Sequence, residues 1–97
     1  MPTYVSLTNW TDQGIKNYKD TLDRAQAASD AIAAAGGSLR DIYYTLGAYD
    51  IVVIADFPDD ETATSFLLGL GSLGNVRSTT MRAFNRDEMA RILEKAG

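Results

Sequence analysis

Apolar residues follow two different periods along this chain, and the change of period separates strands from helices. Four short segments, residues 3–9, 39–46, 49–57 and 76–84, have the alternating or β-branched pattern of strands. Between and after them, apolar residues recur at steps of three and four, which is the spacing of the buried side of a helix. The chain therefore alternates strands and helices over its whole length.

Three helices are expected. The first begins at the N-cap Thr11 and ends at the glycine pair 36–37, the second begins at the N-cap Asp59, and the third follows a capping box at residues 85–88. The expected buried positions are Ile15, Tyr18, Leu22, Ala25, Ser29 and Ile32 in the first helix, Ala63, Phe66, Leu67 and Leu70 in the second, and Met89, Ile92 and Leu93 in the third.

The order of elements predicts the fold class. A β-α-β-β-α-β-α order with a central hairpin is typical of an α+β, ferredoxin-like βαββαβ sandwich with an added C-terminal helix. The 97 residues make a single domain, 1–97. The two longer helices should cover one face of the sheet, and we expect Val5 and Leu7 to point toward them and Tyr4, Ser6 and Thr8 to point away.

The strand at residues 49–57 is apolar on both faces, because residues 51–54 read Ile-Val-Val-Ile. A strand in a small antiparallel sheet normally hides one face and leaves the other in water. A chain of this length has helices for only one face, and an uncovered apolar face is adhesive. We therefore expect a second copy of the chain to cover it, as a face-to-face homodimer that forms an α/β barrel.

Composition removes several classes of function. The chain has no cysteine and no histidine, so disulfides, thiol catalysis, thiolate metal sites and a histidine base are excluded. The net charge is −4 and the nine basic residues are dispersed, which argues against nucleic acid and membrane surfaces as partners. No signal peptide or membrane-spanning stretch is visible, so we expect a cytoplasmic protein, and no metal or cofactor is predicted.

Two segments carry candidate chemistry near the ends of strands. Gly47 supplies the positive φ of a hairpin turn, while Tyr49 and Asp50 place a hydroxyl and a carboxylate either in structural contacts or at the mouth of a ligand site. Trp10 ends the first strand, where it is either a packed aromatic residue or part of an anion site beside a helix start. Tyr43 and Tyr44 point to opposite faces, so Tyr43 is a candidate for the lining of a dimer cavity.

The last strand contributes the candidates for anion recognition. Arg77 and Arg82, with Thr80 between them, can hold a carboxylate or phosphate, or they form salt bridges between subunits, to Asp50 or Asp56. The acidic cluster formed by Asp56, Asp59, Asp60 and Glu61 is interpreted as a helix start that complements the helix dipole, rather than as a metal site.

Several short motifs together resemble the GYD-domain family. They are Asn9-Trp10-Thr11-Asp12-Gln13-Gly14, Thr45-Leu46-Gly47-Ala48-Tyr49-Asp50, and Leu73-Gly74-Asn75-Val76-Arg77 with Thr79-Thr80 and Ala83-Phe84. The likeness extends from Tyr4 to Glu88, and Gly47, Tyr49 and Asp50 match the residues that give the family its name. The resemblance implies a small bacterial protein with a dimeric α/β-barrel, ferredoxin-like domain, and it implies no established activity.

Three functions stay open from sequence alone. The first is a homo-oligomeric protein that binds a small anionic or aromatic molecule in a cavity on the dimer face. The second is a small cofactor-independent enzyme, similar to monooxygenases or isomerases of related folds, with Asp50 as base. The third is a purely structural assembly protein whose interface is filled by side chains.

Overall fold

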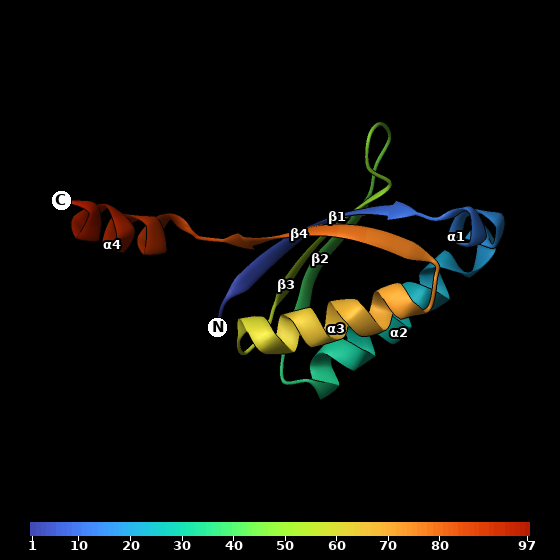
Figure 1. Cartoon of the computed structure of the whole chain (residues 1–97), viewed down its shortest axis with the longest axis horizontal. Helices are drawn as coiled ribbons and strands as arrows, with labels where there is room; N and C mark the ends of the chain where they lie inside the picture. Colours follow the sequence, from blue (N-terminus) through green and yellow to red (C-terminus); the bar gives the residue numbers. More distant parts are fainter.

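A four-stranded antiparallel sheet forms the centre of the computed structural model, which describes residues 1–97, and two long helices cover one of its faces (Figure 1). The strands are arranged in the order β2-β3-β1-β4. The elements are β1 (Thr3–Trp10), α1 (Asp12–Lys16), a 3-10 turn (Tyr18–Asp20), α2 (Thr21–Ala34), β2 (Ser38–Tyr44), β3 (Ile51–Asp56), α3 (Asp60–Ser72), β4 (Val76–Ala83) and α4 (Arg86–Ala96). This is the ferredoxin-like α+β fold that the order of elements predicted.

The helix starts are those that the sequence indicated. The side chain of Thr11 accepts a hydrogen bond from the Gly14 N–H, and Asp59 accepts one from the Thr62 N–H at 2.7 Å. Asn85 and Glu88 form the reciprocal capping box, in which each side chain accepts the main-chain N–H of the other residue. These contacts satisfy donors that a helix start otherwise leaves without partners. None of the helices combines the length and the apolar character that crossing a membrane requires.

The first helical segment differs from the single long helix that the sequence predicted. The chain leaves helical geometry at Asn17, with φ −106° and ψ 38°, so α1 and α2 are separate elements. Ile15, Tyr18 and Leu22 are therefore exposed, Leu22 to 72%, and the prediction that they lie in a buried stripe is wrong. The later part of that stripe is correct, because Ile32 is buried in the core.

Hydrogen bonds, rather than an apolar stripe, hold α1 in place. The Thr11 N–H donates to the Asn75 carbonyl at 3.0 Å. The Gln13 side-chain amide donates to the Leu73 carbonyl at 3.1 Å and to the Asn75 side chain at 3.0 Å. Gly14 is buried so closely against this loop that a Cβ there would overlap the Asn75 carbonyl oxygen. Contacts with the α3–β4 loop thus hold α1 in place, without the buried apolar face that a longer helix would use.

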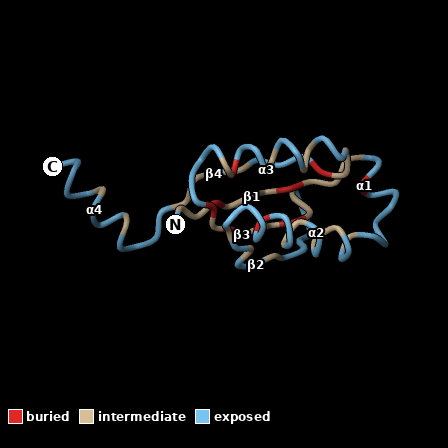
Figure 2. Tube along the Cα trace, turned by 90° about the horizontal axis from the view of Figure 1, so that it is seen from below, coloured by how far each residue is buried: buried red, intermediate tan, exposed pale blue.

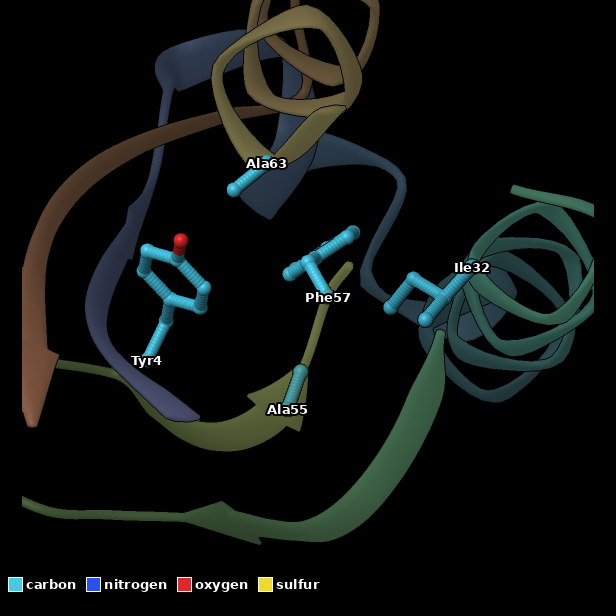
Figure 3. Packing of buried hydrophobic residues seen from close by; sticks show 5 residues of the cluster. All are labelled: Tyr4, Ile32, Ala55, Phe57 and Ala63. Carbon is cyan, nitrogen blue, oxygen red and sulfur yellow. The ribbon is translucent and has the colours of Figure 1, made fainter. Parts of the chain in front are cut away.

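The two faces of β1 are the reverse of the expected assignment. Tyr4 is buried beneath the helices, where its ring packs edge-on against Phe57 and its hydroxyl donates a hydrogen bond to Asp60 at the start of α3 (Figure 3). The same face of β1 carries Ser6 and Thr8, whose hydroxyls pair with hydroxyls of β4 at 2.7 and 3.2 Å. These pairings give the hydroxyl groups of Ser6 and Thr8 hydrogen-bond partners beneath the helices.

The opposite side of the sheet, here called the open face, is apolar and carries no helix (Figure 1). Strand register places Val5 opposite Ile54 and Met81, and Leu7 opposite Val52, on this side. These five residues are half-buried or exposed, and 44% of Met81 is accessible. The expectation of a second apolar face is thus correct, but the residues that form it on β1 are Val5 and Leu7.

The core beneath the helices is small. Only nine of the 97 residues are buried, and five of them form one cluster, Tyr4, Ile32, Ala55, Phe57 and Ala63 (Figure 3). The buried segments in Figure 2 lie in the sheet and in the elements packed on it. A core of this size leaves the chain dependent on a few well-placed contacts between its layers.

Helix α4 lies outside the body of the molecule, beyond the end of β4 (Figures 1 and 2). The extents of 50 × 31 × 19 Å reflect this projection. An ion pair of 3.4 Å between Arg82 and Glu88 ties its first turn to β4. Its apolar residues Met89 and Leu93 are 45% and 60% exposed, so they are not part of the core.

Replacement of Gly14 by alanine should destabilise the fold. The new methyl group would overlap the Asn75 carbonyl, and such overpacking lowers the free energy of unfolding by about 1–3 kcal/mol. The matched control is Gly69→Ala in α3, where nothing lies within 4 Å of the added carbon, and there a gain of about 0.5–1 kcal/mol is expected. Urea unfolding followed by circular dichroism measures the free energy of unfolding of both variants. If both variants changed in the same direction, the close packing of Gly14 against Asn75 would be contradicted.

Tyr4 should be the last of the five tyrosines to ionise. Burial, and then the hydrogen bond to the Asp60 carboxylate, raise the pKa of Tyr4 from 10.0 to about 12. Because the folded-state pKa is raised, the stabilising contribution is complete below pH 10 and is lost as the pH rises toward 12. A phenolate absorbance titration should show one late step that Tyr4→Phe removes and the exposed control Tyr43→Phe retains. Loss of the late step in the control, or its persistence in Tyr4→Phe, would refute the assignment.

Candidate functional site

A hollow with mostly apolar walls lies between α2, α3 and the helix-facing side of the sheet, and we call it the helix–sheet cavity. Its volume is about 380 Å³ and 13 of its 19 lining residues are hydrophobic. The sheet contributes Thr8, Trp10, Ile42, Tyr44, Ile51, Val53 and Val76, the helices contribute Ala25, Ala28, Ala31, Phe66 and Leu70 among others, and Leu73 follows the end of α3. Ligand pockets of about 300–1,000 Å³ with apolar walls are typical of proteins that bind small molecules.

Small side chains on α2 explain why this space exists. Ala25, Ala28 and Ala31 recur at steps of three along the helix and all line the cavity. The helix is anchored further along by Ile32, which packs in the core with Phe57. Since the alanines reach only a short distance from the helix axis, they leave the space above Ile51 and Val53 unfilled.

The polar groups of the lining include one charged side chain, Arg24. Its guanidinium donates to the carbonyls of Asn17 and Gly14 at 3.3 and 3.1 Å and to the Thr21 hydroxyl at 3.2 Å. No carboxylate lies within salt-bridge distance of it, since the two ion pairs of the chain are Arg40–Asp56 and Arg82–Glu88. Arg24 is half-buried and brings a positive charge to an otherwise neutral cavity.

Trp10, a residue singled out from the sequence, also lines the cavity. Its indole Nε1 is the one buried side-chain nitrogen or oxygen that has no hydrogen-bond partner in the chain. Asp50 fixes the main chain at the same point: its carboxylate accepts the Trp10 N–H at 3.0 Å, and its own N–H donates to the Thr8 carbonyl at 2.9 Å. The structure thus brings Trp10 and Asp50 together, and the Asp50 carboxylate holds the end of β1.

The hairpin that contains Gly47 and Tyr49 projects from the sheet (Figure 1). Gly47 has a φ of 114°, which confirms its role as a turn residue. The Tyr49 carbonyl accepts the Thr45 hydroxyl at 2.6 Å, while neither Tyr49 nor Asp50 lines the helix–sheet cavity. The contacts of this motif within the chain are therefore those of a hairpin and a strand end.

The remaining candidates are divided between the two faces of the sheet. Tyr43 and Arg77 are exposed, and their strand register places them on the open face opposite Val52 and Asn9. Thr80 pairs with Ser6 beneath the helices. Alternation along β4 sends the side chains of Arg77 and Arg82 to opposite faces, so the chain does not bring these two together, whereas Arg77 and Thr80 both line a hollow between β4 and α3.

The side chain of Arg82 makes several contacts within the chain. It donates to the carbonyls of Ala83 and Thr3, pairs with Glu88, and lies 4.5 Å from the centre of the Phe84 ring. Within the chain Arg82 forms its salt bridge with Glu88, while the salt bridges considered from the sequence were between subunits, to Asp50 or Asp56. Asp56 instead accepts the Thr3 hydroxyl and pairs with Arg40 at 3.6 Å.

The acidic residues near α3 form a helix start. Asp59 caps the helix, and the hydrogen bonds to Thr62 hold the pKa of its carboxyl below the ordinary value. No group of three or more acidic side chains is arranged to hold a metal ion. This arrangement agrees with the interpretation of the cluster as a complement to the helix dipole.

Sequence reasoning missed Arg24, Thr21 and Asn75 as lining residues. The buried stripe expected from the sequence included Ala25 but neither Ala28 nor Ala31, so the row of alanines that lines the cavity was not recognised. The size of a cavity depends on the distance between two packed layers, and the periodicity of apolar residues along the chain gives no information about that distance.

Comparison with known proteins identifies the family. The model of the GYD domain matches residues 4–93, nearly the whole chain. The chain belongs to the GYD domain family. A relative from Thermus thermophilus, named "Glutamine synthetase and cystathionine beta-lyase binding protein", is 29% identical to this GYD protein over 85 residues, which cover 86% of this chain and 88% of the relative.

Solved structures support the fold of the GYD protein. The crystal structure of TTHA0845, also from Thermus thermophilus, is 28% identical, has a TM-score of 0.55, and is matched over 88% of this chain and 95% of that one. The structure of MtbAldR (Rv2779c) has a TM-score of 0.68 at 14% identity over 88% of this chain, and this likeness shows the fold alone. The GYD protein spans about half of that structure, 54% of its length.

Proposed function

We propose that this GYD protein is a small-molecule-binding module whose ligand lies in the helix–sheet cavity. The observation that carries the proposal is an apolar space of about 380 Å³ with a few polar groups in its lining. Such a combination supplies the binding free energy through burial of apolar surface and the orientation through the polar groups. The proposal moves the ligand from the dimer face, where the sequence placed it, to the helix side of the sheet.

Binding is better supported than catalysis. The cavity lining contains no carboxylate, and the chain has neither histidine nor cysteine, so carboxylate and imidazole bases and a thiol nucleophile are missing from it. Asp50, the candidate base of the enzyme hypothesis, lies outside the lining and accepts the Trp10 N–H. These positions favour a protein that holds a molecule over one that transforms it.

Filling the cavity should abolish binding without damaging the fold. Ala28→Leu adds apolar atoms to the empty space, and the matched control Ala33→Leu adds them to an exposed position on α2 that does not line the cavity. The probe is decan-1-ol, a neutral apolar molecule, and the fluorescence of Trp10, the one tryptophan, reports its entry. We expect saturable binding and a raised melting temperature for the wild type and Ala33→Leu.

Ala28→Leu should show neither effect with decan-1-ol. Its melting temperature without a ligand should be equal to or above that of the wild type, because the added side chain occupies unfilled space. The proposal would be refuted by a wild type that shows no saturable fluorescence response to decan-1-ol, or by an Ala28→Leu variant that binds decan-1-ol as well as Ala33→Leu does.

The open face supports a second part of the proposal, that another copy of the chain covers it. Val5, Leu7, Val52, Ile54 and Met81 lie there without a helix above them, and apolar patches of this kind mark interaction surfaces. A protein partner is the second candidate occupant. The projecting α4 and the name of the Thermus thermophilus relative, which describes the binding of two enzymes, favour that alternative.

The oligomeric state distinguishes the two occupants. Ile54→Lys places a charge in the middle of the open face, while the control Leu68→Lys changes an exposed residue of α3 on the other side of the molecule. Sedimentation should give a dimer for the wild type and Leu68→Lys and a monomer for Ile54→Lys, because burying an unpaired charge is costly. A monomeric wild type would contradict self-association and leave the open face to a different protein.

A further inference from the structure

The chemistry of the helix–sheet cavity is asymmetric, because its charge lies at one end. Arg24 is the single charged residue among the 19 that line it. The guanidinium has five N–H donors, and three hydrogen bonds to neutral oxygens of Asn17, Gly14 and Thr21 leave two of them without a partner. A positive charge without a counter-ion beside an apolar space attracts an anion strongly, since the low dielectric screens it weakly.

The contacts around Gly14 place this charge at the same end as Trp10. Arg24 binds the Gly14 carbonyl, and Gly14 packs against the carbonyl of Asn75, which is another lining residue. The Asn75 carbonyl in turn accepts the N–H of Thr11, the neighbour of Trp10 in the chain. The guanidinium, the indole and the Asn75 amide therefore belong to one end of the cavity.

The opposite end is apolar. It lies between Ala28 and Ala31 of α2 and Phe66 of α3, over Val53 of the sheet. It offers surface for a hydrocarbon or aromatic body and no charge. A ligand that fits both ends has one anionic group and an apolar remainder.

From this arrangement we infer that the ligand is a monocarboxylate with an apolar body, such as a medium-chain fatty acid or an aromatic acid, with its carboxylate at Arg24. This inference rests on the proposed binding function and names the class of ligand. One guanidinium neutralises one carboxylate, whereas a doubly charged phosphate would leave a charge uncompensated in an apolar space. The net charge of −4 adds to the preference for the smaller anionic charge.

The indole of Trp10 reports on this end of the cavity. Trp10 lines the cavity, although its Nε1 is itself buried and not exposed to a ligand there. A carboxylate bound at Arg24 would bring a negative charge near the indole, whereas a hydroxyl group would not. Entry of an acid should therefore alter the emission of Trp10 beyond the change that a neutral chain causes.

The test compares decanoate with decan-1-ol, which share the same hydrocarbon chain. The two ligands are titrated into the wild type, Arg24→Gln and Arg24→Lys, and the fluorescence of Trp10 and the melting temperature are measured. We expect the wild type to bind decanoate at least about tenfold more tightly than the alcohol. Arg24→Gln should lose that preference and keep its affinity for the alcohol, and Arg24→Lys, which retains the charge, should keep most of the preference.

The outcomes separate this inference from the binding function. Equal affinities of the wild type for both ligands would overturn the inference and leave the proposed function standing. A preference for decanoate that survives in Arg24→Gln would also overturn it. Failure of the wild type to bind either ligand would refute the proposed function itself. If Arg24→Gln does not fold, as loss of alcohol binding would indicate, Arg24→Lys is compared with the wild type at rising salt. The preference for decanoate should then weaken more in Arg24→Lys than in the wild type, because salt screens an exposed lysine contact.

Discussion

Burial of the Tyr4 ring against Phe57, with its hydroxyl donating to the Asp60 carboxylate, joins the sheet to the first turn of α3, and the rest of the structure depends on this junction. It turns the hydroxyl-bearing face of β1 toward the helices, so that Ser6 and Thr8 pair with β4 beneath them. It also sets Phe57 edge-on against the Tyr4 ring, which gives the small core its centre. With α3 held there and α2 held by Ile32, the space between the two helices is defined.

Much of the fold was predictable because local chemistry specifies it. The N-caps Thr11 and Asp59 and the capping box at residues 85–88 require partners only three residues away, so they are visible in the chain itself. The face assignment of β1 was not predictable in the same way. Alternation divides the strand into two sets, but which set is covered depends on Asp60, a residue 56 positions from Tyr4.

The candidate site was predictable only in part. Trp10 was identified because it ends a strand beside a helix start, and it does line the cavity. Arg24 escaped notice because its position on α2 differs in no local way from that of any exposed helical arginine. The environment of Arg24 is created where the helix is interrupted at Asn17, because this interruption lets α1 pack against the α3–β4 loop. The contacts that hold α1 there join residues distant in sequence.

The alanines of α2 allow the size of the helix–sheet cavity to vary with little effect on the fold. Their side chains line the cavity, while Ile32 of the same helix packs in the core, so substitutions at these positions change the free volume more than the packing. A valine or leucine in place of Ala25, Ala28 or Ala31 adds two or three carbon atoms to the lining. Chains that differ from this one only at these positions would keep the same architecture around an inner space of different length and width.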